Sequence, residues 1–199
     1  MHAKRLFYFN LYYCKIANAD KDLEKEKIHL LKKELSQQGH KELVEICLNM
    51  AKLKVENKEM LSYLLFDADN PLEYAQGIKQ EIQLQFKELN VHYYYATKSL
   101  RKTLRLINKY SRFTKFKQGE IELLLHFSAL FSNTIASDTK HLPLLGLQYR
   151  SLTKAASLIQ KIHEDLRYDY VKEFNLILEK TKSSFKNWDA QKFMVQELD

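Results

Sequence analysis

Eight cations lie between residues 91 and 119, with no carboxylate among them. The segment reads VHYYYATKSLRKTLRLINKYSRFTKFKQG, and its basic residues are Lys98, Arg101, Lys102, Arg105, Lys109, Arg112, Lys115 and Lys117. The whole chain has 32 Lys and Arg against 25 Asp and Glu, so the rest of the chain is close to neutral without these eight. Cations at this density can neutralise the phosphates of a nucleic acid.

The spacing of these residues predicts a helix that begins near Val91 and has two unlike sides. Its apolar side carries Tyr93, Ala96, Leu100, Leu104 and Ile107. Its cationic side carries Lys98, Arg101, Lys102, Arg105, Lys109 and Arg112. The rings of Tyr94 and Phe116 lie close enough to the cations in sequence to stack on unpaired bases. These six cations and two rings are the candidate residues for binding an anion or a nucleic acid.

Several partners remain open for the cationic side. Neighbouring cations repel one another by about a few tenths of a kcal/mol per i,i+4 pair. The long Lys and Arg side chains can simply form a solvated face. Otherwise a nucleic acid, an acidic protein surface or anionic lipid has to neutralise their positive charges. Asp165, Asp169 and Glu173 form an acidic stripe at i, i+4 and i+8. This stripe is a candidate counter-face, either within one chain or between the two copies of a homodimer.

No pattern of known catalytic chemistry occurs in the chain. There is no GxxxxGK[ST], GxGxxG, GxSxG or HExxH motif. We therefore expect a non-enzymatic interaction module without catalytic residues or cofactor, and an enzyme with a site assembled from distant residues is the remaining alternative.

The acidic cluster at residues 67–70 does not predict a metal site. Asn70, Pro71 and Glu73 match a helix start, with an N-cap residue, proline at the first position and a capping box. We expect a helix here and no bound metal.

The composition predicts an all-α protein. Only 4 Gly and 2 Pro occur in 199 residues, too few for the frequent turns of a β-rich fold. One domain is expected over residues 1–199, with an aromatic helix or arm at 1–19 and a helical body at 20–199. The expected architecture is an α–α superhelix of the HEAT-like kind with irregular repeats, or else an irregular multi-helix bundle.

Periodicity places most helices of this body. Gly39 is expected to be the C-cap of the first helix of this body, and Gly119 is expected to lie in a turn. The helix at 58–66 is expected to be central. The expected helices are 20–38, 41–54, 58–66, 71–89, the basic helix, 120–132, 143–183 (as one helix or as two that break near His163) and 185–198.

The two cysteines and the hydropathy predict a cytoplasmic protein. Cys14 and Cys47 form no ligand pattern and are expected to be free, mostly buried thiols in a reducing compartment. No apolar run reaches the roughly 18 residues that span a bilayer. The aromatic run after Lys4 and Arg5 is too short and too polar for a signal peptide.

Three segments together resemble a group of small bacterial all-helical proteins. They are LSYLLFDA at 61–68, KSLRKTLR at 98–105 with the nearby Asn108-Lys109-Tyr110, and Lys117-Gln118 with the following Glu120 and Glu122-Leu123. The resemblance covers about residues 20–180 and implies a helical fold without an assigned activity.

At the level of the fold, the chain also resembles HEAT-like DNA-binding proteins, including the helical-repeat alkylpurine DNA glycosylases. Those enzymes use tryptophans and an aspartate in a basic cleft. Because Trp188 is the single tryptophan here, the resemblance does not carry the catalytic pattern over.

Overall fold

The computed structural model describes residues 27–185, 188 and 195–198, and every regular element in them is helical. The all-α prediction is confirmed. The elements are α2 (Ile28–Leu35), α3 (His40–Leu53), α4 (Val55–Ser62), the π-helical segment η1 (Tyr63–Asp67), α5 (Pro71–Lys87), α6 (Tyr93–Thr114), α7 (Lys117–Thr134), α8 (Leu142–Ile159) and α9 (Glu164–Ser184). The predicted aromatic arm at 1–19, its boundary and Cys14 lie outside the described residues.

The chain divides into two compact units, residues 1–54 and 55–199. The prediction of a single domain stays a prediction. The division falls where α3 ends, at Lys54, whose backbone is extended.

The described part of the first unit contains no buried residue. Helical spacing places Leu31, Leu35 and Met50 on the apolar sides of α2 and α3, but all three are exposed. Cys47 is exposed too, so its predicted burial is wrong. Gly39 does not end α2 with a left-handed residue; its extended backbone precedes α3 as the N-cap. Amphipathic spacing therefore identified these helices but not their surroundings.

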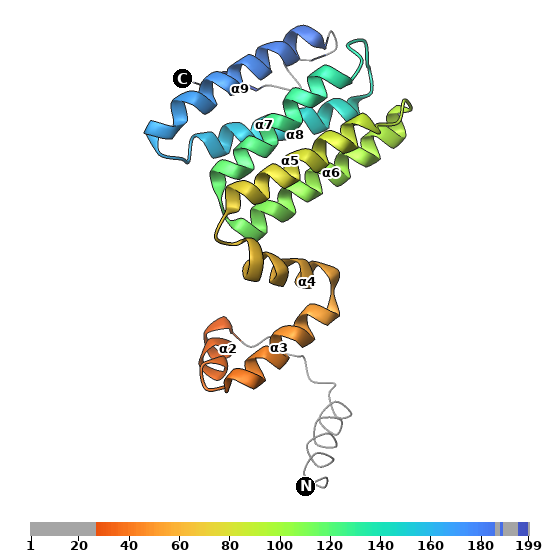
Figure 1. The fold of residues 1–199 in the computed structure, drawn as a ribbon. Helices are drawn as coiled ribbons and strands as arrows, with labels where there is room; N and C mark the ends of the chain where they lie inside the picture. Colours follow the sequence, from red (N-terminus) through yellow and green to blue (C-terminus); the bar gives the residue numbers. More distant parts are fainter. Residues whose placement is uncertain (1–26, 186–187, 189–194, 199) are drawn as a thin grey trace, which may run out of the picture. The chain divides into compact units, whose positions relative to one another are not determined.

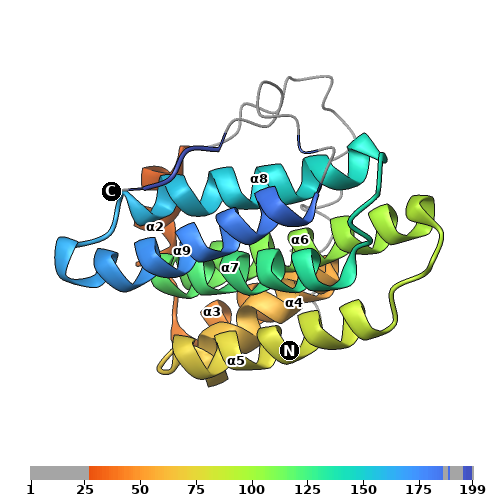
Figure 2. The same ribbon diagram turned by 90° about the horizontal axis from the view of Figure 1, so that it is seen from above.

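The second unit arranges its five long helices in two rows. Helices α5, α7 and α9 form one row, α6 and α8 form the other, and each helix contacts its neighbours within and between the rows. In both Figure 1 and Figure 2, α7 lies between α5 and α9. Five helices in two rows are compatible with a short α–α superhelix and with a small helical bundle. The choice between the two predicted architectures therefore stays a prediction.

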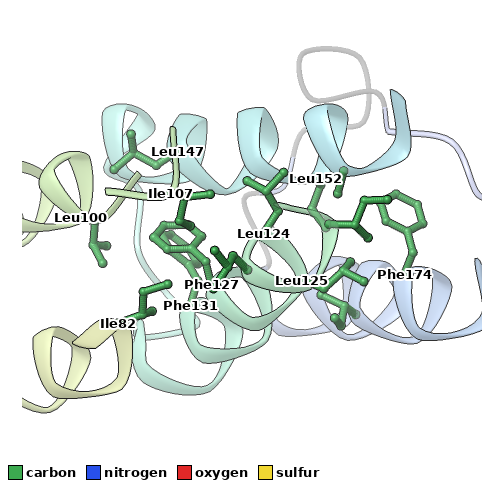
Figure 3. Close-up of a cluster of buried hydrophobic side chains, with 14 of the residues drawn as sticks. Ile82, Leu100, Ile107, Leu124, Leu125, Phe127, Phe131, Leu147, Leu152 and Phe174 are labelled. Atoms are coloured by element: carbon green, nitrogen blue, oxygen red, sulfur yellow. The ribbon is translucent and has the colours of Figure 1, made fainter. Parts of the chain in front are cut away.

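Helix α7 forms the centre of the second unit because apolar residues surround most of its circumference. Its buried side chains pack against side chains from α5, α6, α8 and α9, as Figure 3 shows. The labelled members of this core are Ile82, Leu100, Ile107, Leu124, Leu125, Phe127, Phe131, Leu147, Leu152 and Phe174. Each such side chain contributes about 1.5–3 kcal/mol by leaving water.

The predicted helix at 58–66 forms as α4 followed by η1, but it is not central. Tyr63 is buried, whereas Leu64, Leu65 and Phe66 are exposed. Its apolar residues follow one another in sequence, and a helix distributes consecutive residues around its circumference. The prediction of a central helix is therefore wrong.

The start of α5 is confirmed as predicted. The Asn70 Oδ1 accepts a hydrogen bond from the backbone N–H of Glu73 at 3.2 Å, and the Asn70 Nδ2 donates to the Glu73 carboxylate at 2.9 Å. Pro71 occupies the first turn. Leu72, which helical spacing places on the apolar side of α5, is exposed.

The turn between α6 and α7 lies earlier than expected. Lys115 ends α6 with a left-handed backbone, φ 53°, and α7 begins two residues later. Gly119 therefore lies in the first turn of α7, where it is buried. A Cβ atom at this position would lie 2.1 Å from the Tyr110 hydroxyl oxygen. The glycine thus permits close contact between α6 and α7.

The long apolar pattern at 143–183 forms two helices, one of the two forms expected. The chain breaks between Ile159 and Glu164, and His163 caps α9 by accepting a hydrogen bond from the Asp165 N–H. The helix expected at 185–198 is wrong for its described residues, since Phe185, Trp188 and 195–198 lie outside any helix.

Candidate anion-binding groove

Charge is divided between the two rows of the second unit. Helices α6 and α8 together carry eight Lys and Arg and no Asp or Glu. Helices α5, α7 and α9 carry seven Lys and Arg and nine Asp and Glu. The basic character of α6 therefore continues onto its neighbour α8, which sequence analysis did not identify.

A groove of about 490 Å³ lies between α6 and α8. Its cationic side chains come from both helices, and α7 contributes to the apolar part of its lining. The lining residues are Arg101, Leu104, Arg105 and Asn108 from α6, Leu124 from α7, and Leu147, Arg150, Ser151 and Lys154 from α8. Leu124 and Leu147 belong to the core in Figure 3, so the base of the groove rests on packed side chains.

One of the four cations in the groove is already neutralised. Lys154 Nζ lies 2.5 Å from the Oε1 of Glu120 and donates to the Asn108 Oδ1 at 2.7 Å. Glu120 is buried, and its second oxygen accepts a hydrogen bond from the Ser111 hydroxyl. A buried carboxylate needs such partners, so we assign Lys154 a structural role.

The three arginines of the groove have no carboxylate partner among the described residues. Arg101, Arg105 and Arg150 are exposed, and no ion pair within the described ranges includes them. A guanidinium presents five N–H donors in a planar fork that fits a phosphate or a carboxylate with two hydrogen bonds. The groove can therefore hold an anionic group against an apolar base.

The last two cations predicted on α6 face acids from α4. Lys109 Nζ lies 3.0 Å from Glu59, and Arg112 pairs with Glu56. Exposed pairs such as these contribute about 0–1 kcal/mol each to stability. Their main consequence is electrostatic, since they partly neutralise the C-terminal end of the cationic side.

The remaining predicted residues lie apart from the groove lining. Lys98 and Lys102 are exposed on α6. Tyr94 is 71% exposed, with its ring edge-on to Tyr95 one turn before Lys98. Phe116 is half-buried beyond the end of α6, so it does not join the groove.

The predicted acidic stripe does not pair with α6 within one chain. Asp165 is exposed and lies 3.2 Å from the imidazole of His163, and the described ion pairs join neither Asp169 nor Glu173 to any cation of α6. The internal counter-face is therefore wrong, because the acids that pair with cations of α6 come from α4. Pairing of this stripe with the α6 helix of a second copy of the chain stays a prediction.

A second cluster of polar groups joins α5, α7 and α9. Lys79 Nζ lies 2.7 Å from the Glu122 carboxylate, which also accepts a hydrogen bond from the Tyr170 hydroxyl at 3.2 Å. Burial and the negative charge of Glu122 raise the pKa of Tyr170 to about 12. Burial also raises the pKa of Glu173 and, together with Lys79, lowers the pKa of His126.

Lys79, Glu122 and Tyr170 bind one another in this cluster, whereas the buried His126 Nε2 has no hydrogen-bond partner among the described residues. Within the part of the chain that the structure describes, no three His, Cys, Asp or Glu side chains are placed to hold a metal ion. The hydrogen bonds of Glu122 to both Lys79 and Tyr170 indicate a structural role, linking three helices of one row.

Comparison with known proteins finds no matching family model, no matching curated protein and no matching solved structure. None of the described helices has the length and apolar character needed to cross a membrane.

Sequence reasoning found Arg101 and Arg105 and missed Arg150 and Lys154. These two stand at i and i+4 in a segment without acids, a weaker form of the signal that identified α6. The sequence could not show that α8 lies beside α6, or that Glu120 of α7 forms an ion pair with Lys154.

Proposed function

We propose that this protein is a non-enzymatic helical module that binds nucleic acid through the surface formed by α6 and α8. The observation that supports the proposal is the groove whose three arginines, Arg101, Arg105 and Arg150, lack carboxylate partners among the described residues. Lys98 and Lys102 extend this surface along α6.

Three features favour a nucleic acid over an acidic protein. Arg101, Arg105 and Arg150 have no acid paired with them among the described residues, whereas the core of a protein interface is depleted of charged residues. The unpaired cations of the groove are arginines, which suit the geometry of phosphate oxygens. Exposed Tyr94 and Tyr95 lie on the first turn of the same helix and offer stacking surfaces.

A direct test titrates a fluorescently labelled 20-nucleotide DNA or RNA with the full chain at low salt and follows the anisotropy. We expect saturable binding that Arg105→Glu weakens by roughly tenfold or more, because a phosphate contact becomes a repulsion. The matched control is Lys172→Glu, which makes the same charge change at an exposed lysine of α9. Equal weakening in both variants, or no binding by the unmodified chain, would contradict the proposal.

Self-association through the acidic stripe is the second candidate, because Asp169 is exposed on α9 and the described ion pairs leave it without a cation. In that case the unmodified chain forms a dimer that Arg105→Glu dissociates and that adding Asp169→Arg restores. Light scattering at several protein concentrations decides between the two, since a strict monomer contradicts the dimer alone.

A further inference from the structure

We propose that the groove between α6 and α8 accepts an unpaired nucleotide, with its phosphate on the arginines and its base on the apolar floor, so that the protein prefers single strands to duplexes. This inference rests on the proposed function and specifies which nucleic acid it concerns. Three observations carry it: the size of the groove, the kind of cation on its rims and the apolar character of its base.

The groove has the dimensions of a site for one nucleotide rather than for a double helix. Its volume of about 490 Å³ falls in the range typical of small-molecule sites, roughly 300–1,000 Å³. Helices that pack side by side, as α6 and α8 do, have axes only about 8–10 Å apart. A duplex can therefore touch the rims, but only an unstacked nucleotide can reach the floor.

The cations lie where they can hold a phosphate beside that floor. Arg101 and Arg105 stand one helical turn apart on α6, and Arg150 lies across the groove on α8. The groove thus presents guanidinium groups from both rims, while Lys98 and Lys102 are not part of its lining. Guanidinium groups also stack on bases through their planar faces, which ammonium groups do not.

The floor offers an unpaired base apolar contact and one polar group. Leu104, Leu124 and Leu147 form it; Leu124 and Leu147 are buried, so the half-buried Leu104 gives most of the accessible leucine surface. Asn108 lies in the same lining and accepts a hydrogen bond from Lys154 through its Oδ1. The described hydrogen bonds do not use its amide nitrogen, which therefore remains a donor for a base edge.

A duplex has to break pairing and stacking before it can place a base in this groove. A single strand does not, and the structure therefore predicts a preference for single strands. An abasic strand of equal length keeps all phosphates but has no base to place on the floor.

The test compares three labelled ligands on the full chain at one salt concentration: a 20-nucleotide single strand, a hairpin duplex with the same number of phosphates, and an abasic strand. We expect the single strand to bind about tenfold or more tightly than either of the other two. Equal affinity for all three overturns the inference and leaves the proposed function intact. Binding of none of them contradicts the proposed function itself.

A pair of variants separates the floor from the charges. Leu104→Gln nearly keeps the size of the side chain and adds no charge, but it makes the floor of the groove polar. We expect it to reduce the preference for the normal strand over the abasic strand by about threefold or more. Leu106→Gln is the matched control. Leu106 also lies on α6 and is half-buried against the hydrophobic core, but it does not line the groove. Circular dichroism confirms that both variants are folded. An unchanged preference in Leu104→Gln overturns the inference.

Discussion

At the scale of single residues, Glu120 decides how many cations the groove presents. Its buried carboxylate holds Lys154, which would otherwise be the fourth cation of the lining. Arg150, one turn earlier on the same helix, has no such partner among the described residues. Two neighbouring cations on α8 therefore differ in role because of one residue contributed by α7.

Replacing Glu120 by glutamine should release Lys154 for ligand binding. Glutamine keeps an acceptor for the Ser111 hydroxyl, but its amide no longer attracts the ammonium group. We expect the slope of log affinity against log salt to steepen by about 0.7 for a single strand. Glu122→Gln removes the same charge from the Lys79 pair outside the groove lining, and an equal change in slope there would contradict the assignment.

Gly119 is the residue on which the contact between α6 and α7 depends most directly. We expect Gly119→Ala to lower the free energy of unfolding by about 1–3 kcal/mol, because the new methyl group displaces the buried Tyr110 ring. Thermal or urea unfolding measures the change. Gly77→Ala in α5 is the control: no atom lies within 4 Å of its added Cβ, so the better helix former should stabilise by about 0.5–1 kcal/mol. An unchanged free energy of unfolding in Gly119→Ala would contradict the close contact between α6 and α7 at this residue.

Glu173 gives the structure a stability that depends on pH. Although the Glu173 side chain reaches the surface, partial desolvation of its carboxyl group raises its pKa above the usual 4.5, and Glu122 raises it further, against the opposing effect of Lys79. A raised folded-state pKa means that the group's stabilising contribution is present below about pH 4.5 and is lost as the pH rises through the folded-state value. The ionised carboxylate therefore costs stability at neutral pH.

We accordingly expect Glu173→Gln to raise the melting temperature at pH 7.5 and to have little effect near pH 4, where the carboxyl group is mostly protonated in both states. Melting curves across this range measure the difference. Exposed Glu179→Gln on the same helix is the control and should show no such trend. A gain that persists at pH 4 would mean that packing rather than charge explains the effect.

At the scale of elements, α6 shows both the reach and the limit of sequence reasoning. Its start near Val91 and most of its buried stripe follow from the 3.6-residue period: Ala96, Leu100 and Ile107 are buried, although Tyr93 is exposed. Its cations appeared equivalent in sequence. In the structure Arg101 and Arg105 face α8, whereas Lys109 and Arg112 face α4. Which neighbour a residue meets depends on tertiary packing, and no local pattern encodes it.

The short apolar elements were the least predictable. Segment 41–54 has helical periodicity and segment 58–66 is a run of mostly apolar residues, yet Met50 and Phe66 are exposed. Periodicity reports that a helix has an apolar side and does not report what covers that side. By contrast, Asn70 and Pro71 were predictable in detail, because a capping box depends only on residues within one turn.

At the scale of the whole molecule, the formal charge of +7 is a local property. One row of the second unit carries cations without acids, and the other row is slightly acidic. Such separation directs an anionic polymer to one surface, because unlike potentials on two faces favour one orientation of encounter. The sequence predicted half of this surface, since the contribution of α8 became visible only once α8 lay beside α6.

The most direct test of the central claim is the salt dependence of single-strand binding in two charge-matched triple variants. One variant replaces Arg101, Arg105 and Arg150 by alanine, and the other replaces exposed Lys87, Lys161 and Lys172. Both lose three positive charges. The groove variant should lose about 0.7 of slope per arginine, roughly two units in total, and most of its affinity at low salt, while the control should stay close to the unmodified chain. Equal slopes in the two variants would show that general charge, and not this groove, binds the nucleic acid.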